Sequence, residues 1–260
     1  MKKIIYTDLD GTLLDAETYL FEKANEALDL IKKFDMPLVF CTSKTRAEIE
    51  FWREKIKNSD PFISENGGGI FIPKKYFDFR FLYDKEYKNY FAIKLGTDYS
   101  QLKDIMGVLK EKFEITSFSD MPVEEIAKDA DLEISQARLA KKREFDLPFK
   151  ILDKKQEKYI INDIKNHGLN YTVGGRYYHL LGNNNKGGAI KILSELFRRK
   201  YGHIKTIAIG DSENDFQMLD VVDKGYLVKK KNGVYASIKY DKAKKIGPAG
   251  WNEIIKSEVL

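Results

Sequence analysis

The chain has 260 residues, with 45 Lys+Arg against 40 Asp+Glu and a net charge of +5 at pH 7. A hydrophobic fraction of 43% is enough to bury a core, which excludes a disordered polymer. One cysteine and three histidines exclude a disulfide framework and a zinc centre built on those residue types, so any metal would have oxygen ligands.

The distribution of apolar and basic residues excludes two further classes of partner. No apolar run approaches the roughly 20 residues of a membrane span, so we expect a cytoplasmic protein with no membrane partner. The short basic runs are scattered and interleaved with acids, which is typical of solvated surfaces, so we also expect no nucleic-acid partner.

The first third of the chain alternates strand and helix patterns. Continuous apolar runs predict strands at 3–7, 37–42 and 61–64, and helical spacing predicts helices at 21–34 and 45–56. Buried strands that alternate with helices favour a parallel sheet with helices on both faces, which is an α/β fold.

A different pattern follows, and the first pattern then returns. The middle of the chain predicts strands at 91–95, 114–117, 149–152 and 171–181, with helices at 101–112, 122–129, 132–142 and 154–167. The end predicts a helix at 186–200, a strand at 205–210, a helix at 212–222 and a strand at 225–228. We therefore expect a discontinuous core, 1–82 plus 184–260, interrupted by an α+β unit at 83–183. Hinges would lie near 83–84 and 181–183.

The first strand ends in Asp8-Leu9-Asp10-Gly11-Thr12. Residues i and i+2 of a strand share a face, so both carboxylates can point into the crevice at the strand ends where α/β sheets bind ligands. Two adjacent carboxylates repel each other unless a cation neutralises them, and hard oxygen ligands favour Mg²⁺. The alternative is a simple strand end followed by an Asp-Gly turn.

Three later motifs occupy equivalent positions. Thr42 and Ser43 precede a helix, where hydroxyls and backbone N–H groups form a phosphate seat, or only a helix cap. Lys186 opens a helix against the helix dipole, which suggests an anionic partner. Asp211 and Asp215 follow the strand at 205–210, and their alternative role is helix capping by Ser212 and Asp215.

In this order the motifs resemble the haloacid dehalogenase superfamily. The resemblance implies a Rossmann-like core with an inserted αβ cap that determines specificity. It also implies a phosphatase in which Asp8 attacks phosphorus to form an aspartyl-phosphate, while Asp10 protonates the leaving alcohol and later deprotonates water. Mg²⁺ would be bound by Asp8, Asp10 through its backbone carbonyl, and Asp211, with Asp215 holding Lys186 or a metal-bound water. Lys186, as a further catalytic residue, and Thr42 or Ser43 would add donors to the phosphate.

A finer resemblance lies in the segments 41–46, 65–68, 143–149 and 174–182. These resemble phosphatases that act on mannosyl-3-phosphoglycerate, so the implied partner is a small phosphorylated glycoside that carries a carboxylate. Arginines can grip a carboxylate in a two-pronged manner. The expected substrate-binding residues are Lys44, Arg46, Glu65, Asn66, Arg138, Arg143 and Arg176. For each cap arginine, the alternative is an ion pair with a nearby acid.

Other readings stay open on the sequence alone. The substrate could be glucosyl-3-phosphoglycerate or sucrose phosphate, and a phosphomannomutase fits the cap motifs poorly. A sensor that binds Mg²⁺ and a phosphosugar without turnover is the alternative from another class, although a receptor does not need a general acid at Asp10. The chain is compatible with a monomer or a homodimer.

Overall fold

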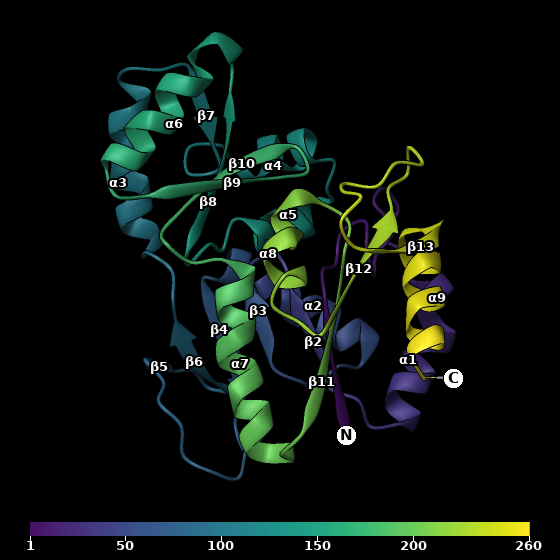
Figure 1. Cartoon of the computed structure of the whole chain (residues 1–260). Helices are drawn as coiled ribbons and strands as arrows, with labels where there is room; N and C mark the ends of the chain where they lie inside the picture. Colours follow the sequence, from purple (N-terminus) through teal and green to yellow (C-terminus); the bar gives the residue numbers. More distant parts are fainter. Residues whose placement is uncertain (260) are drawn as a thin grey trace.

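The computed structural model describes residues 1–259, which form two sheets with their helices (Figure 1). The larger sheet has nine strands in the order β13-β12-β11-β1-β2-β3-β4-β6-β5. Its strands are β1 (Lys2–Thr7), β2 (Leu38–Cys41), β3 (Phe62–Ser64), β4 (Gly69–Pro73), β5 (Lys85–Glu86), β6 (Tyr90–Lys94), β11 (Ile204–Gly210), β12 (Lys224–Lys229) and β13 (Asp241–Ile246).

The strands from β13 to β3 are all parallel, whereas β4, β6 and β5 are added antiparallel. At the centre, Ile5 of β1 pairs with Ile207 of β11 on one side and with Leu38 of β2 on the other. The last four residues of β1 are buried because helices cover both faces of this sheet. The predicted α/β class is therefore confirmed.

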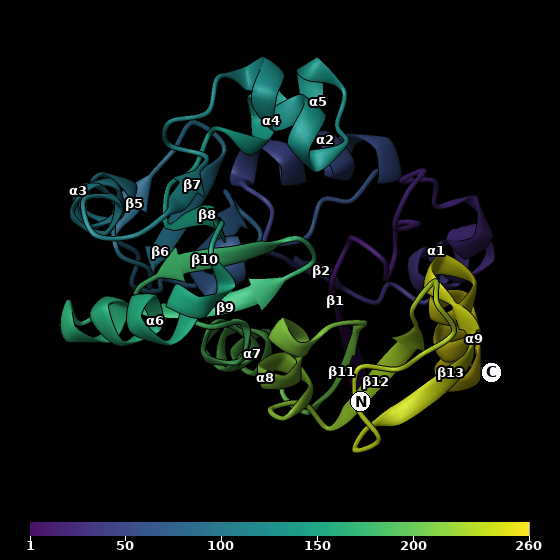
Figure 2. The same cartoon turned by 90° about the horizontal axis from the view of Figure 1, so that it is seen from above.

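Two layers of helices cover the larger sheet, and Figure 2 shows them on its opposite faces. Ile5 packs with α1, α2 and α9, whereas its neighbours Ile4 and Tyr6 pack with α7 and α8, as the two-residue period of a strand requires. These helices are α1 (Asn25–Lys33), α2 (Arg46–Ile56), α7 (Lys186–Tyr201), α8 (Phe216–Leu219) and α9 (Gly247–Val259). Among residues 1–259, no helix combines the length and the apolar character needed to cross a membrane.

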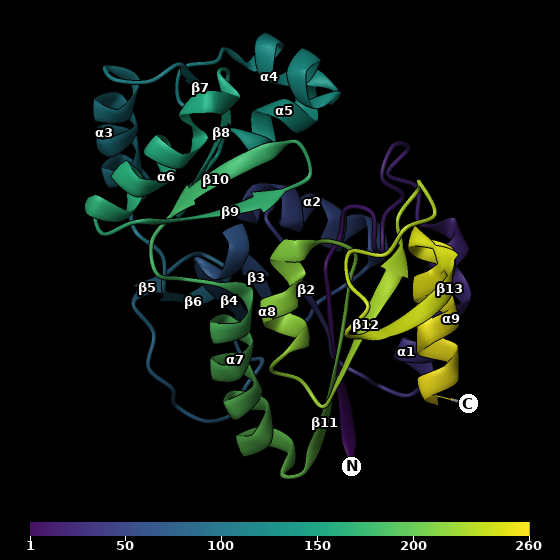
Figure 3. The same cartoon turned by 45° about the horizontal axis from the view of Figure 1, so that its top comes forward.

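The smaller unit, here called the cap, has its own antiparallel sheet in the order β7-β8-β10-β9 and its own apolar cluster around Phe149. Figures 1 and 3 place it above the carboxyl ends of the core strands. Its elements are α3 (Tyr99–Lys110), β7 (Ile115–Ser117), α4 (Val123–Ala130), α5 (Ile134–Ala140), β8 (Asp146–Ile151), α6 (Glu157–Asn166), β9 (Asn170–Gly174) and β10 (Tyr177–Leu181). Short 3₁₀ helices η1 (Glu22–Ala24), η2 (Glu65–Gly67), η3 (Lys154–Gln156) and η4 (Glu213–Asp215) complete the chain.

Several predicted boundaries differ from the structure. The run 171–181 is a hairpin rather than one strand, because Gly175 adopts a φ of +58° and turns the chain between β9 and β10. The helix predicted at 212–222 consists only of η4 and the single-turn α8. The strands β4, β5 and β13 and the helix α9 lie outside the predicted elements.

The first link between core and cap lies elsewhere than predicted, whereas the second overlaps the predicted hinge at 181–183. The cap was expected to begin at residue 83, but β5 and β6 hydrogen bond into the core sheet, so the separate sheet and its helices begin only after residue 95. The two links touch each other, because a Cβ placed on Gly182 would meet Thr97. The cap therefore joins the core through 95–98 and 182–184.

Candidate active site

The parallel pairing of β1 and β11 brings the first and last motifs together. Thr7 is in register with Ile209, so Asp8 and Asp211 emerge side by side at the carboxyl edge of the sheet. Gly11 has a φ of +74°, and a Cβ there would lie 3.0 Å from Asp211 Oδ2. Glycine at this position therefore permits both the left-handed turn and the close approach of the Asp8–Gly11 loop to Asp211.

Asp215 combines the two roles that the sequence left open. Its Oδ2 accepts hydrogen bonds from the backbone N–H groups of Asp211, at 2.9 Å, and Ser212, at 3.0 Å, as part of a capping box. Its Oδ1 accepts a hydrogen bond from Lys186 Nζ at 2.6 Å. One buried carboxylate thus shapes the loop after β11 and also binds a cation.

Lys186 has the anionic partners that its place at the start of α7 suggested. Its side chain is 1% exposed, and Nζ donates to Asp8 Oδ1 at 2.8 Å as well as to Asp215. Burial opposes the charged ammonium, but Asp215 and Asp8 outweigh it and raise the pKa of Lys186. This lysine is therefore a fixed positive charge between two carboxylates.

The oxygens of Asp8, Asp211 and Asp215 can all lie within 4.8 Å of one another. Burial raises the pKa of Asp8 to about 8, although Lys186 lowers it, and burial together with Asp215 raises the pKa of Asp211 to about 6. These raised pKa values reflect the repulsion between poorly solvated carboxylates. A bound divalent cation would offset that repulsion. The three oxygen donors fit a hard metal ion.

Asp10 lies outside this three-carboxylate cluster and is more exposed than its three acids. Its side chain is 41% exposed and forms an ion pair with Lys44 Nζ at 2.9 Å. Lys44 is itself buried, and its Nζ lies 3.6 Å from Glu48, at the first turn of α2. Burial opposes its charge, but Asp10 and Glu48 raise the pKa of Lys44. Asp10 thus places a partly exposed carboxyl, paired through Oδ2 with Lys44, next to the buried Asp8.

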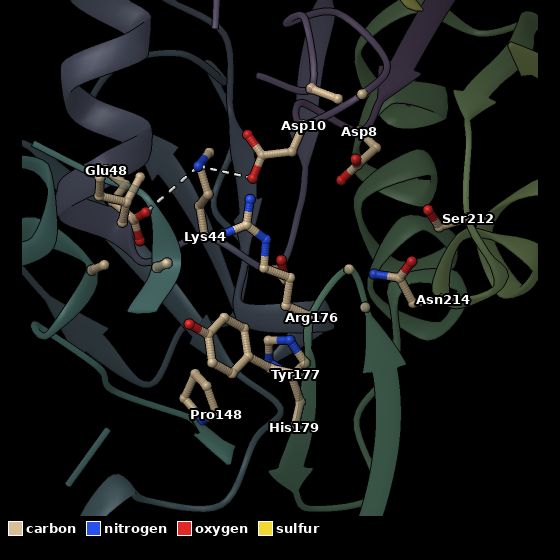
Figure 4. A pocket seen from close by; sticks show the side chains of 18 of the residues that line it. Asp8, Asp10, Lys44, Glu48, Pro148, Arg176, Tyr177, His179, Ser212 and Asn214 are labelled. Atoms are coloured by element: carbon tan, nitrogen blue, oxygen red, sulfur yellow. Dashed lines mark ion pairs between the residues drawn. The ribbon is translucent and has the colours of Figure 1, made fainter. Parts of the chain in front are cut away.

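The predicted phosphate seat at the end of β2 divides into two different environments. Ser43 lines a cavity of about 260 Å³ between core and cap, whereas Thr42 is 1% exposed and its hydroxyl accepts a hydrogen bond from the backbone N–H of Lys44 at 3.4 Å. The same cavity contains side chains from both units (Figure 4). Among its lining residues are Asp8, Asp10, Ser43, Lys44, Arg143, Arg176, Tyr177, His179 and Asp211.

Arg143 lines this cavity, but its guanidinium is already engaged. Its side chain is 6% exposed, and it donates to Ser43 O at 2.8 Å, to Ala140 O at 3.0 Å and to Asp146 Oδ1 at 3.2 Å. The ion-pair alternative therefore holds for Arg143, with Asp146 as the acid. The expected two-pronged grip on a substrate carboxylate would require Arg143 to leave these partners.

Glu65 and Asn66 hold the cap against the core. Glu65 is fully buried, and its carboxylate accepts hydrogen bonds from the backbone N–H groups of Glu144, at 3.0 Å, and Phe145, at 2.8 Å. Asn66 donates from Nδ2 to Asp146 Oδ2 at 2.8 Å. These contacts bind cap residues 144–146 rather than leaving both side chains free for sugar hydroxyls.

The three remaining arginines fall into different environments. Arg46 donates to Glu144 Oε1 at 2.8 Å and to Glu50 at 3.2 Å, so it joins the core to the cap outside the cavity. Arg138 is exposed on α5. Arg176 is 56% exposed, its nearest carboxylate is 4.0 Å away, and Figure 4 shows it pointing toward Lys44 and Asp10. Arg176 is thus the arginine of this set that faces the cavity with little competition.

Sequence reasoning missed His179 as a site residue and treated it as one of three scattered histidines. It lines the cavity and is 4% exposed, and its Nδ1 lies 2.9 Å from Asp146 Oδ2. The available signal was its spacing from Tyr177, because residues i and i+2 of β10 share the face that meets the cavity. Its acidic partner, 33 positions away in the sequence, gave no local signal.

Comparisons with known proteins agree with this architecture. A family model described as haloacid dehalogenase-like hydrolase matches residues 5–238. The chain is 46% identical, over 98% of its length and 96% of the relative's, to a glucosyl-3-phosphoglycerate/mannosyl-3-phosphoglycerate phosphatase of Methanococcoides burtonii. It is 34% identical, over 95% and 96%, to a mannosyl-3-phosphoglycerate phosphatase of Pyrococcus horikoshii. A haloacid dehalogenase-like hydrolase from B. subtilis shares the fold, with a TM-score of 0.70, 18% identity and coverage of 98% and 99%.

Proposed function

Because the chain belongs to the haloacid dehalogenase-like hydrolase family, we propose that it is a phosphatase of phosphoglycerate glycosides. Its substrate would be mannosyl-3-phosphoglycerate, glucosyl-3-phosphoglycerate or both, as the names of its relatives suggest. The observation that carries the proposal is the buried Asp8, bound to Lys186 at 2.8 Å, beside the partly exposed Asp10 in a cavity between core and cap.

Asp8 and Asp10 divide the chemistry between a nucleophile and a proton donor. Asp8 attacks phosphorus, the bond from phosphorus to the leaving oxygen breaks, and Asp10 gives its proton to that oxygen. Water then attacks the aspartyl-phosphate while Asp10 takes its proton, which releases phosphate and restores both carboxyls. The exposure of Asp10 supports this role, because the group must reach the leaving oxygen and then water.

Lys186 prepares Asp8 for attack, while the nearby acids position Lys186 and would hold a metal ion. The ammonium favours the ionised form of Asp8, which burial and the neighbouring carboxylates oppose. Mg²⁺ held by Asp8, Asp211 and the backbone carbonyl of Asp10 would supply positive charge that screens the nucleophile from the phosphate. Asp215 keeps Lys186 and the Asp211 loop in position through its three hydrogen bonds.

The cap side of the cavity suits a small substrate with an anionic group beyond the phosphate. Arg176 can bind a carboxylate through its guanidinium without breaking a short ion pair. Ser43 lines the same cavity and can donate its hydroxyl to the phosphate. We therefore assign the carboxylate-binding role that the sequence suggested for Arg143 to Arg176.

A phosphate-release screen tests the proposal. The purified protein is assayed with Mg²⁺ against both phosphoglycerate glycosides, sucrose phosphate and a simple hexose phosphate. We expect the highest kcat/KM for the carboxylated glycosides. A preference for substrates without a carboxylate would contradict the substrate class, and tight binding of the glycoside without phosphate release would favour a sensor.

A further inference from the structure

His179 forms a pair with Asp146 inside the cap, and no catalytic step described above uses it. Nδ1 of His179 lies 2.9 and 3.0 Å from the two oxygens of Asp146. Asp146 is fully buried, and Asn66 and Arg143 also contact it. The imidazole is thus held by an acid that is itself fixed from both the core and the cap.

This pairing determines which nitrogen of the ring carries the proton. Burial would raise the pKa of Asp146, but His179 and Arg143 outweigh it and lower the pKa below its ordinary value, so the carboxylate is ionised. An ionised carboxylate only accepts hydrogen bonds, so Nδ1 of His179 must donate. Because Nδ1 is taken by Asp146, Nε2 is the ring nitrogen left for another partner.

The free nitrogen of the ring points toward open space in the cavity. Within residues 1–259, Nε2 of His179 has no hydrogen-bond partner, while the ring lines the cavity across from Asp8 and Asp10 (Figure 4). A Cβ on Gly174 would lie 3.5 Å from this Nε2 and 3.3 Å from Asn214 Nδ2. Glycine at 174 therefore keeps clear the space between a hydrogen-bond acceptor and an amide donor.

We propose that Nε2 of His179 accepts a hydrogen bond from a hydroxyl of the glycosyl group, with Asp146 as the residue that positions the ring. This inference rests on the proposed function, since it concerns the part of the substrate that remains after phosphate and carboxylate are bound elsewhere. 3-Phosphoglycerate has no glycosyl hydroxyls, so this contact distinguishes a glycoside from 3-phosphoglycerate itself. His179 would thus be a specificity-determining residue.

The test compares two variants on two substrates. His179→Asn keeps a donor to Asp146, because the asparagine amide occupies the place of Nδ1, but it removes the acceptor in the cavity. Gly174→Ala leaves His179 intact and narrows the space next to it. We expect His179→Asn to raise KM for the glycoside about tenfold, the value of one lost buried hydrogen bond, with kcat nearly unchanged. We expect kcat/KM for 3-phosphoglycerate to stay at the wild-type value.

Each other result overturns the inference in a recognisable way. An equal loss with 3-phosphoglycerate would show that His179 acts on the phosphate, on the carboxylate or on the position of the cap. An unchanged KM for the glycoside in both variants would show that no hydroxyl binds there. If His179→Asn lowers the unfolding temperature, the KM of Gly174→Ala for the glycoside decides whether a hydroxyl binds next to His179. Failure of the wild-type protein to hydrolyse any glycoside would instead refute the proposed function, and the inference with it.

Discussion

The core and the cap both send charged side chains into one cavity, but they bind their charges differently. In the core, Asp8, Asp211 and Asp215 gather around Lys186, and burial leaves two of these acids with raised pKa values. In the cap, Arg143 is neutralised by Asp146, whose pKa is lowered. The core concentrates unbalanced negative charge, whereas the buried charges of Arg143 and Asp146 in the cap balance each other.

This difference separates the residues that carry out the reaction from the residues that maintain the shape of the cavity. A raised carboxyl pKa marks a site whose charge is incomplete without a ligand, and such sites are candidates for chemistry. A lowered pKa in a buried ion pair marks a contact that is complete without a ligand. We therefore expect substitutions in the core cluster to change turnover and those in the cap pairs to change stability or substrate preference.

The largest expected effect tests the core. Asp8→Asn should lower kcat by about 10³ or more on every phosphate ester, because the amide cannot attack phosphorus. Phosphate release measures this loss, and thermal unfolding should show no destabilisation, since a crowded buried carboxyl has been neutralised. Asp29→Asn, an exposed change on α1, is the matched control and should leave activity unchanged. Substantial Mg²⁺-dependent turnover by Asp8→Asn would contradict the assignment.

The next effect tests the cap. Arg143→Ala removes the partner of the fully buried Asp146, so we expect it to lower the free energy of unfolding by about 3 kcal/mol, as measured by urea denaturation. Arg138→Ala, an exposed arginine of the same unit, should change it by less than about 0.5 kcal/mol. A stable Arg143→Ala variant whose only defect is a raised KM for the carboxylated glycoside would restore the substrate-clamp interpretation.

The third prediction concerns Glu258, a charged residue of the core outside the cavity. It tests whether charges of the core are balanced away from the active site. Glu258 binds Lys205 at 2.8 Å, Lys224 at 2.7 Å and Tyr226 at 2.6 Å. Burial would raise its pKa, but these partners lower it to about 2. A lowered pKa gives stability that is fully present above the ordinary value near 4.5 and is lost as the pH falls toward 2.

Replacing this acid should therefore destabilise the protein in a pH-dependent way. We expect Glu258→Gln to lower the free energy of unfolding by about 2 kcal/mol at pH 7, and by less at pH 3, in urea titrations at both values. Glu195→Gln, in an exposed pair with Arg198, is the control and should change little at either pH. A deficit that stays constant between pH 7 and pH 3 would contradict the assigned pKa.

The smallest effect tests the junction between the two units. Glu144 of the cap accepts hydrogen bonds from Arg46 and from Tyr87 of the core. Glu144→Gln should cost no more than about 1 kcal/mol, as for a partly exposed pair, but it should speed limited proteolysis at 95–98 and 182–184. Mg²⁺ with a phosphate analogue should slow that cleavage.

The control for this experiment is a variant that changes a different contact of Arg46. Glu50→Gln removes the other acidic partner of Arg46, within helix α2 of the core, with the same change of charge. We expect no change in the cleavage rate for this variant. Equal acceleration by both substitutions would show that the arginine contact does not hold the cap closed.

The order of elements and the position of the core site could be predicted from sequence because both follow from local rules. Apolar runs identified β1, β2 and β11, and parallel strands place their carboxyl ends on one edge. Asp8 and Asp211 were therefore expected at the same edge of the sheet, and the pairing of β1 with β11 brings them side by side. The hairpin at Gly175 could have been predicted from the Gly174-Gly175 pair, which is a turn signal inside the run 171–181. The strand β13 was missed because most of its residues are exposed.

The roles of the cap side chains, by contrast, depend on tertiary contacts. Whether Arg143 faces a substrate or Asp146, and whether His179 has an acidic partner, depends on which strands of the cap pair and on how η2 of the core meets them. The sequence alone determined an α/β core of the haloacid dehalogenase type with its acids at one edge, because backbone periodicity and strand direction are local properties. Only the tertiary structure decided which cap side chains are free to bind, because ion pairs between distant segments leave no periodic trace in the sequence.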